Sequence, residues 1–171
     1  MKIILLGYMG SGKSTIARLL AQQLQIPVLD LDECIEKKEQ MSIHSIFENK
    51  GEIYFRKSEH EVFKELMAFS NEFVLSLGGG TPCYANNHEL LRGESVVSFY
   101  LKVPVEVLTE RLQQEKQSRP LIAAKEGQEL QDFIAQHLFE RSYYYHKATH
   151  VIDAGEKAQE EIVAEIESYL I

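Results

Sequence analysis

The sequence predicts an α/β fold, in which a parallel β-sheet is flanked by helices, and two observations lead to it. Short apolar runs typical of strands alternate along the chain with longer segments of helical spacing. Strands that alternate with helices are usually parallel and joined by helical crossovers. The first run, Ile3–Leu6, is also continuously apolar and is stopped by a glycine, as expected for a strand buried on both faces.

The next elements follow from spacing and from residues that favour helix ends. Apolar side chains recur at helical spacing in Lys13–Leu24, and the short apolar run Val28–Leu31 predicts a second strand. From there to about residue 69 the chain is expected to be mostly helical. Ser42 is suited to cap a new helix, and Gly51 indicates a bend between two helices.

The third strand is expected at Phe73–Leu77, where three glycines in a row, Gly78–Gly80, end it abruptly. A short helix near Asn87–Leu91 leads to a fourth strand at Val96–Leu101. A proline fits the first turn of a helix, so Pro104 predicts a helix that runs to about Gln114.

The last third begins with a polar segment, Gln113–Gly127, that has little periodic apolar content and is expected to be a mobile loop. Helical spacing returns in Leu130–Tyr145. A last strand is expected at His150–Ile152, and Gln159–Ile171 has the spacing of an amphipathic helix.

Length and composition narrow the functional classes. The 171 residues fit one domain, and the net charge of −8 argues against a broad nucleic-acid-binding surface. The two cysteines, Cys34 and Cys83, have no metal-like spacing and are expected to be reduced thiols. No apolar run has the length of a membrane span, and the opening segment is interrupted by Gly7, so we expect a cytoplasmic protein without a membrane partner.

The residues Gly7–Ser14 satisfy the pattern G-x-x-x-x-G-K-[ST] at every position and are followed by Thr15. Glycines let the backbone wrap around phosphates, and the start of the next helix adds a positive dipole end. Lys13 supplies a full charge, and the Ser14 hydroxyl suits Mg²⁺. A plain glycine-rich turn is the alternative, but an expected strand before and helix after favour a P-loop that binds a nucleoside triphosphate.

A switch GTPase carries the same loop, so its other motifs matter. Asn49–Glu52 resembles the guanine-binding N-K-x-D, but it ends in glutamate and lies between helices instead of after a buried strand. No D-x-x-G follows a strand either. The sequence therefore favours a kinase over a GTPase.

Polar and glycine residues follow two expected strands at the edge where ligands bind in open parallel sheets. Asp30 and Asp32 are two residues apart, so in extended chain both would point to one side, towards the P-loop. Asp32 would otherwise only cap the next helix. The run Gly78–Gly80 has more glycines than a turn needs, which favours a ligand resting against bare backbone.

Three arginines have ordinary explanations when each is taken alone. Arg56 has Glu52 at i−4 for a surface ion pair, Arg119 lies in the polar loop, and Arg141 lies on a late helix where a solvent-facing side chain is expected. The six histidines are scattered without metal-ligand spacing.

Together these residues resemble shikimate kinase over nearly the whole chain. The motifs that carry the resemblance, in chain order, are GYMGSGKST, Leu29-Asp30-Leu31-Asp32, Ile46-Phe47 with Gly51-Glu52 and Phe55-Arg56, Ser76-Leu77-Gly78-Gly79-Gly80, Arg119-Pro120-Leu121, and Glu140-Arg141 with Tyr145. Six such motifs in the right order and spacing are highly specific. The resemblance implies a three-layer P-loop kinase fold like the nucleoside monophosphate kinases, with sheet order 2-3-1-4-5 and a mobile lid.

The resemblance also implies roles for residues. Those for ATP are Gly10, Ser11, Gly12, Lys13, Ser14, Thr15, Arg111 and Arg119. Those for shikimate are Asp32, Arg56, Gly78, Gly79, Gly80 and Arg141. Ser14 and Asp30 would hold Mg²⁺, and Lys13, Asp32 and Arg119 would be catalytic. Residues 1–171 would form one domain, with a shikimate-binding region at about 32–62 and a lid at about 113–127.

The implied reaction is phosphorylation of shikimate by ATP, giving shikimate 3-phosphate and ADP, by a protein expected to be a monomer. Two alternatives stay open at this point. One is another small P-loop kinase, acting on gluconate or a nucleoside monophosphate. The other is a nucleotide-binding protein without turnover, which ATP consumption with and without acceptor would distinguish.

Overall fold

A computed structural model describes residues 1–115 and 119–171, and its centre is a five-stranded sheet of order β2-β3-β1-β4-β5. All four strand pairings are parallel, so the predicted fold class and strand order are confirmed. The strands are β1 (Lys2–Leu6), β2 (Val28–Asp30), β3 (Phe73–Ser76), β4 (Val96–Lys102) and β5 (His150–Asp153).

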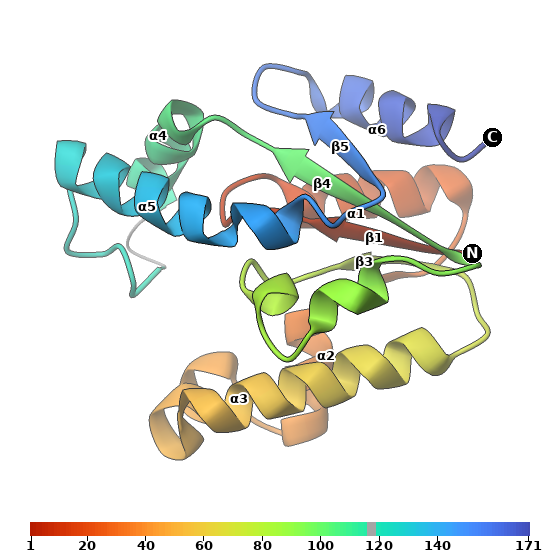
Figure 1. The fold of residues 1–171 in the computed structure, drawn as a ribbon, viewed down its shortest axis with the longest axis horizontal. Helices are drawn as coiled ribbons and strands as arrows, with labels where there is room; N and C mark the ends of the chain where they lie inside the picture. Colours follow the sequence, from red (N-terminus) through yellow and green to blue (C-terminus); the bar gives the residue numbers. More distant parts are fainter. Residues whose placement is uncertain (116–118) are drawn as a thin grey trace.

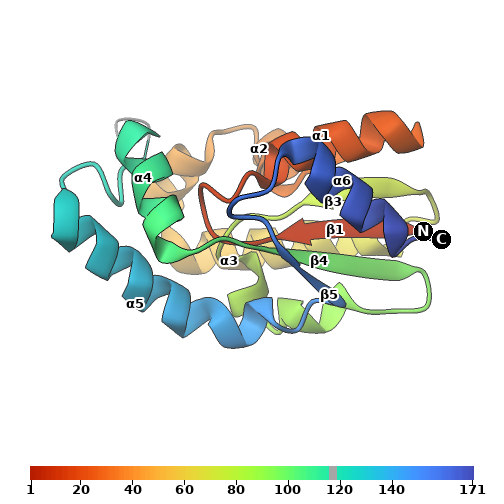
Figure 2. The same ribbon diagram turned by 90° about the horizontal axis from the view of Figure 1, so that it is seen from above.

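Helices lie on both sides of this sheet (Figures 1 and 2). They are α1 (Lys13–Leu24), α2 (Leu31–Glu39), α3 (Ile43–Ala68), α4 (Val105–Glu115), α5 (Gly127–Tyr145) and α6 (Gln159–Ser168), with short 3₁₀ turns η1 (Thr81–Cys83) and η2 (Asn87–Leu91). In Figure 2, α1 and α6 lie on one side of the strands and α5 on the other. Contacts of α1 with α6 and β3, and of α5 with η1, agree with these layers.

The central strand β1 explains where the site forms. It pairs with β3 on one side and β4 on the other, and Ile3–Leu6 are completely buried. The chain leaves this strand at Gly7, whose φ of 153° and close approach to the Leu101 carbonyl exclude a side chain there. The P-loop therefore begins at the carboxyl end of the sheet, the edge where ligands bind in parallel sheets.

The segment after β2 turns into helix sooner than the sequence predicts. β2 ends at Asp30 and α2 starts at Leu31 because the Asp30 side chain caps the helix, accepting hydrogen bonds from the backbone N–H groups of Asp32 and Glu33. The expected breaks at Ser42 and Gly51 are both present. Ser42 caps α3 through the Ser45 N–H, and Gly51, with φ of 84°, kinks it.

The segment expected as a loop at 113–127 is helical at its start, because α4 continues to Glu115. Residues 116–118 of the expected lid lie outside the described part of the chain. Beyond them, Ile122 is completely buried and holds its segment against the core, whereas the adjacent Leu121 is mostly exposed. Among residues 1–115 and 119–171, no helix is long and apolar enough to cross a membrane.

Candidate active site

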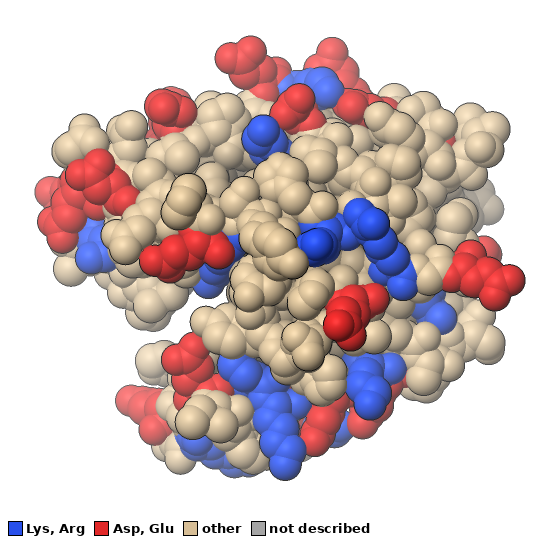
Figure 3. Space-filling model, viewed as in Figure 1, with Lys and Arg blue, Asp and Glu red and all other residues tan. Residues whose placement is uncertain are grey.

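A cavity of about 540 Å³ opens at the carboxyl end of the sheet, directly over the P-loop. Its walls combine the P-loop with Asp30, Asp32, part of the glycine run, Arg111 and Arg119. Figure 3 shows the surface hollowed between the regions of α5 and α3, with side chains of both charges near both walls. Inside the cavity, Lys13, Arg111 and Arg119 supply local positive charge in a protein whose net charge is −8.

The P-loop has the geometry that phosphate binding requires. Gly10 and Gly12 have φ of 81° and 91°, in the left-handed region that favours glycine. Lys13 is almost buried, and its ammonium group donates to the carbonyls of Gly7, at 2.8 Å, and Tyr8, at 3.0 Å. Burial, with Arg119 adding repulsion, lowers the pKa of Lys13 to about 8. A bound phosphate would place negative charge beside the Lys13 ammonium group and so stabilise its charged form.

Ser14 and Asp30 bring two hard oxygen ligands together. The Ser14 hydroxyl donates to Asp30 Oδ2 at 3.4 Å, while the other Asp30 oxygen is occupied in capping α2. Oxygen atoms of this kind fit Mg²⁺, which in kinases takes few protein ligands and completes its shell with phosphates and water. Within the described ranges, no cluster of three or more His, Cys, Asp or Glu side chains could hold a metal ion.

Asp32 does not lie in extended chain beside Asp30, and the sequence-based expectation on this point is wrong. It occupies the first turn of α2, where the Asp30 cap rotates it towards the cavity. Its capping alternative also fails, because Asp30 is the cap. Burial, with the carboxylates of Asp30 and Glu59 nearby, raises the pKa of Asp32 to about 6.

The glycine run is the point where three candidate side chains meet. A Cβ atom on Gly78 would lie 3.2 Å from Asp32 Oδ1, and one on Gly79 would lie 3.1 Å from Arg141 Nη1. On Gly80 it would lie 2.7 Å from Arg56 Nη2. Gly78 also leaves room for the Thr81 hydroxyl, at 3.1 Å, so all three glycines make space for polar side chains, and this explains why the run exceeds what a turn needs.

Arg56 has a stronger partner than the surface pair that its spacing suggests. Its Nη1 donates to Glu59 Oε1 at 2.8 Å, whereas Glu52 lies at 3.9 Å from Nε. Only 17% of the Arg56 side chain and 1% of the Glu59 side chain are exposed. The Tyr84 ring covers the guanidinium at 3.9 Å. These contacts fix a charged group in place, as expected for a binding residue.

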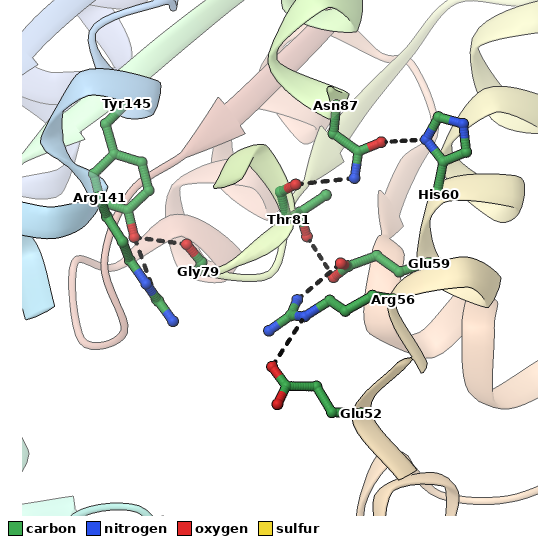
Figure 4. A network of polar contacts seen from close by, with 9 residues as sticks. All are labelled: Glu52, Arg56, Glu59, His60, Gly79, Thr81, Asn87, Arg141 and Tyr145. Atoms are coloured by element: carbon green, nitrogen blue, oxygen red, sulfur yellow. Dashed lines mark hydrogen bonds and ion pairs between the residues drawn. The ribbon is translucent and has the colours of Figure 1, made fainter. Parts of the chain in front are cut away.

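Arg141 approaches the same open space from α5 (Figure 4). It lies 3.5 Å from the Tyr145 hydroxyl, which itself donates to the Gly79 carbonyl at 2.6 Å. Tyr145 thereby ties α5 to the glycine run. The two guanidinium groups, Arg56 and Arg141, point into one space from opposite sides, an arrangement suited to a carboxylate.

The other two arginines lie beside the P-loop. Arg111 donates from Nη1 to the Gly10 carbonyl at 3.0 Å, which ties α4 to the P-loop. Arg119 pairs with Glu115 at 3.2 Å, and its buried Nε has no hydrogen-bond partner among the described residues. Arg119 is also near enough to Lys13 to contribute to its lowered pKa.

Comparison with known proteins decides the family. The family model for shikimate kinase matches residues 9–170. The chain belongs to the shikimate kinase family. A shikimate kinase from Flavobacterium johnsoniae is 54% identical over 165 residues, which are 96% of each chain. The crystal structure of shikimate kinase from Bacteroides thetaiotaomicron has a TM-score of 0.90 at 36% identity, covering 99% of this chain and 98% of that one.

A third comparison concerns a ligand. The shikimate kinase from Acinetobacter baumannii, whose structure is in complex with shikimate, has a TM-score of 0.86 at 32% identity, covering 99% of this chain and 92% of that one. The chain that carries Arg56, Arg141 and the glycine run is therefore similar to a protein whose structure contains shikimate.

Shikimate kinase motifs alone did not single out every residue of this site. Glu59, which orients Arg56, was missed, although its i,i+3 position from Arg56 on a helix was a usable signal. Lys157 and Gln159, which line the cavity after β5, were also missed. No local pattern marks them, because the fold alone brings their segment to the P-loop.

Proposed function

We infer that this protein transfers the γ-phosphoryl group of ATP to the 3-hydroxyl of shikimate, giving shikimate 3-phosphate and ADP. This reaction is a step towards chorismate and the aromatic amino acids. One observation carries the proposal: a complete P-loop lies beside a glycine run on which Asp32, Arg56 and Arg141 converge. That combination offers sites for a triphosphate, a hydroxyl and a carboxylate together.

On the nucleotide side, the amides and hydroxyls of residues 10–15 would cradle the phosphates, and Lys13 would exchange its two carbonyl partners for phosphate oxygens. Arg111 would flank the base, which its position between Gly10 and Gly155 supports. Ser14 and Asp30 would hold Mg²⁺, Asp30 through water. A bound Mg²⁺ supplies neutralisation of phosphate charge.

On the acceptor side, within the region of about 32–62 and the glycine run, Arg56 and Arg141 would grip the shikimate carboxylate. The planar, permanently charged guanidinium suits a carboxylate better than an ammonium does. Gly78, Gly79 and Gly80 would line the pocket. Asp32 would accept a hydrogen bond from the acceptor hydroxyl and take its proton, which its pKa of about 6 permits at neutral pH.

Phosphoryl transfer requires positioning and charge stabilisation more than covalent chemistry. Arg119 would leave Glu115 and meet the transferred group when the lid, about residues 113–127, closes. Closure would also exclude water, which otherwise competes with shikimate as acceptor.

The test is ADP release in a coupled assay with Mg-ATP and shikimate, with gluconate and AMP as control acceptors. We expect release that depends on shikimate. Release with gluconate or AMP alone would keep the kinase and overturn the acceptor assignment. ATP binding without release for any acceptor would establish a nucleotide-binding protein without turnover. Monomeric state, cytoplasmic location and lack of nucleic-acid partners stay predictions.

A further inference from the structure

Behind Arg56 lies a chain of buried hydrogen bonds that reaches the glycine run by a second route (Figure 4). The Thr81 hydroxyl donates to Glu59 Oε2 at 2.8 Å, while Arg56 donates to the other oxygen of the same carboxylate. Thr81 is completely buried, and Glu59 is 99% inaccessible, so no bulk water can replace either bond.

Thr81 itself is rigidly placed. Its backbone N–H donates to the Gly78 carbonyl at 3.1 Å, and its carbonyl accepts from the buried Asn87 at 2.9 Å. His60, on the same helix as Arg56, shares a hydrogen bond of 2.6 Å with the Asn87 side chain. The hydroxyl of Thr81 is therefore fixed relative to both the glycine run and α3.

This placement decides how Glu59 holds Arg56. A carboxylate and a guanidinium prefer a two-point pairing, in which both oxygens bind two N–H groups. Here the pairing has one point, since Thr81 occupies Oε2, and the buried Arg56 Nε has no hydrogen-bond partner among the described residues. Without the Thr81 hydroxyl, Glu59 Oε2 would lose its hydrogen-bond donor. Arg56, which already donates to Oε1 of the same carboxylate, would then pair with both oxygens.

We propose that Thr81 is a positioning residue that limits the Glu59–Arg56 pair to one hydrogen bond. The other N–H groups of Arg56 then face the carboxylate of the acceptor. The proposal rests on the proposed function for the identity of that acceptor. It assigns to Thr81 a selective effect on acceptor affinity through Arg56, without contact between Thr81 and the substrate.

The experiment compares Thr81→Val, which removes the hydroxyl at similar shape, with Thr81→Ser, which retains it. A lost hydrogen bond to a charged group is worth about tenfold or more in an equilibrium constant. We therefore expect Thr81→Val to raise the KM for shikimate about tenfold, with kcat and the KM for ATP changed less than about threefold. Thr81→Ser should remain within about threefold of the unmodified protein in all constants.

A matched control is Thr109→Val, because Thr109 is also buried and its hydroxyl donates only within α4, to the Val105 carbonyl. It should leave the KM for shikimate unchanged. A second readout uses shikimate whose carboxylate is replaced by a primary amide. Thr81→Val should lose much of the preference for the carboxylate, since it withdraws the arginine that recognises it.

Equal rises in the KM for ATP and for shikimate, an unchanged KM for shikimate, or failure of Thr81→Ser to restore it would each overturn the proposal. Thermal unfolding of each variant shows whether it folds. Should Thr81→Val not fold, Thr81→Cys, with a weak donor of similar size, takes its place and is expected to raise the same KM. If the unmodified protein releases no ADP with shikimate, the proposed function fails first, a result distinct from these.

Discussion

Asp32 shows how a single residue is placed in conflict with its surroundings. It is largely buried, it faces Asp30 and Glu59, and its pKa of about 6 lies well above its ordinary value of 3.8. Such a site disfavours the charged form that a proton acceptor needs. The charged form of Asp32, which the proposed chemistry requires, therefore lowers the stability of the folded protein.

We expect Asp32→Asn to stabilise the protein at neutral pH while reducing turnover. Between pH 3.8 and about 6 the folded protein keeps a proton that the unfolded chain releases, so stability falls as pH rises through this window. Above pH 6 the full cost is present, and the substitution should remove roughly 1–3 kcal/mol of it. Urea unfolding at pH 7.5 and pH 3.5 measures this.

The gain from Asp32→Asn should nearly vanish at pH 3.5, where the folded protein and most unfolded chains carry the proton. A gain of equal size at both pH values would show that packing, and not ionisation, causes it. Turnover measured on the same samples should fall at every pH, because the amide cannot accept the proton.

At this scale the sequence predicted which residues matter better than how they are oriented. Asp30 and Asp32 were both identified, but the strand was expected to run to Leu31, with both carboxylates directed to one side by extended chain. The Asp30 cap ends the strand at that point, and a capping hydrogen bond depends on backbone angles that the residue types only suggest. Glu59 was overlooked because a glutamate on a helix usually faces solvent.

Among the elements, the turn that follows β3 contacts polar side chains from three different helices. Its glycines lie against Asp32, Arg141 and Arg56 in turn, and Thr81, which follows them, donates to Glu59. Gly80 has φ of −91° and ψ of −13°, which alanine also adopts easily. The need for glycine there comes from the neighbouring arginine and not from the backbone.

Gly80→Ala should therefore fold normally and lose acceptor affinity. The added methyl group would lie 2.7 Å from Arg56 Nη2 and would displace the guanidinium. We expect a KM for shikimate raised about tenfold or more, with stability changed by less than about 1 kcal/mol. Steady-state kinetics and thermal unfolding measure both.

Gly93→Ala is the matched control, because a methyl group there meets only Val96 at 3.4 Å, an ordinary contact. It should leave both constants unchanged. Unaltered shikimate kinetics in Gly80→Ala would mean that Arg56 does not need its observed position.

For the whole molecule, the alternation of strands and helices was sufficient to predict the parallel sheet, and the family resemblance supplied its order. What periodicity could not predict is the structure of the segment after α4. There Ile122 is buried while the adjacent Leu121 is exposed, and a single anchoring side chain leaves no periodic signal. The sequence did not predict Lys157 and Gln159 as site residues for a related reason, since only tertiary structure brings them to the cavity.

The proposed acceptor pocket lies between two helices, with Arg56 on α3 and Arg141 on α5. We therefore expect shikimate alone to slow amide hydrogen exchange in both segments, near residues 52–60 and 137–145, because one ligand would restrain both. Mass spectrometry of exchange with and without shikimate measures this. Arg141→Met should abolish the protection in both segments, and protection confined to one of them would contradict a shared carboxylate.

The central place of β1 also has a consequence for synthesis. This strand is made before both of its neighbours, β3 and β4, and β4 begins only at Val96. At typical rates of translation, its apolar residues wait about 5–20 s for that partner. Sheets that pair distant segments also fold slowly. The nascent chain thus exposes one edge of an apolar strand until β4 has been made, even after β3 is available to pair with the other edge.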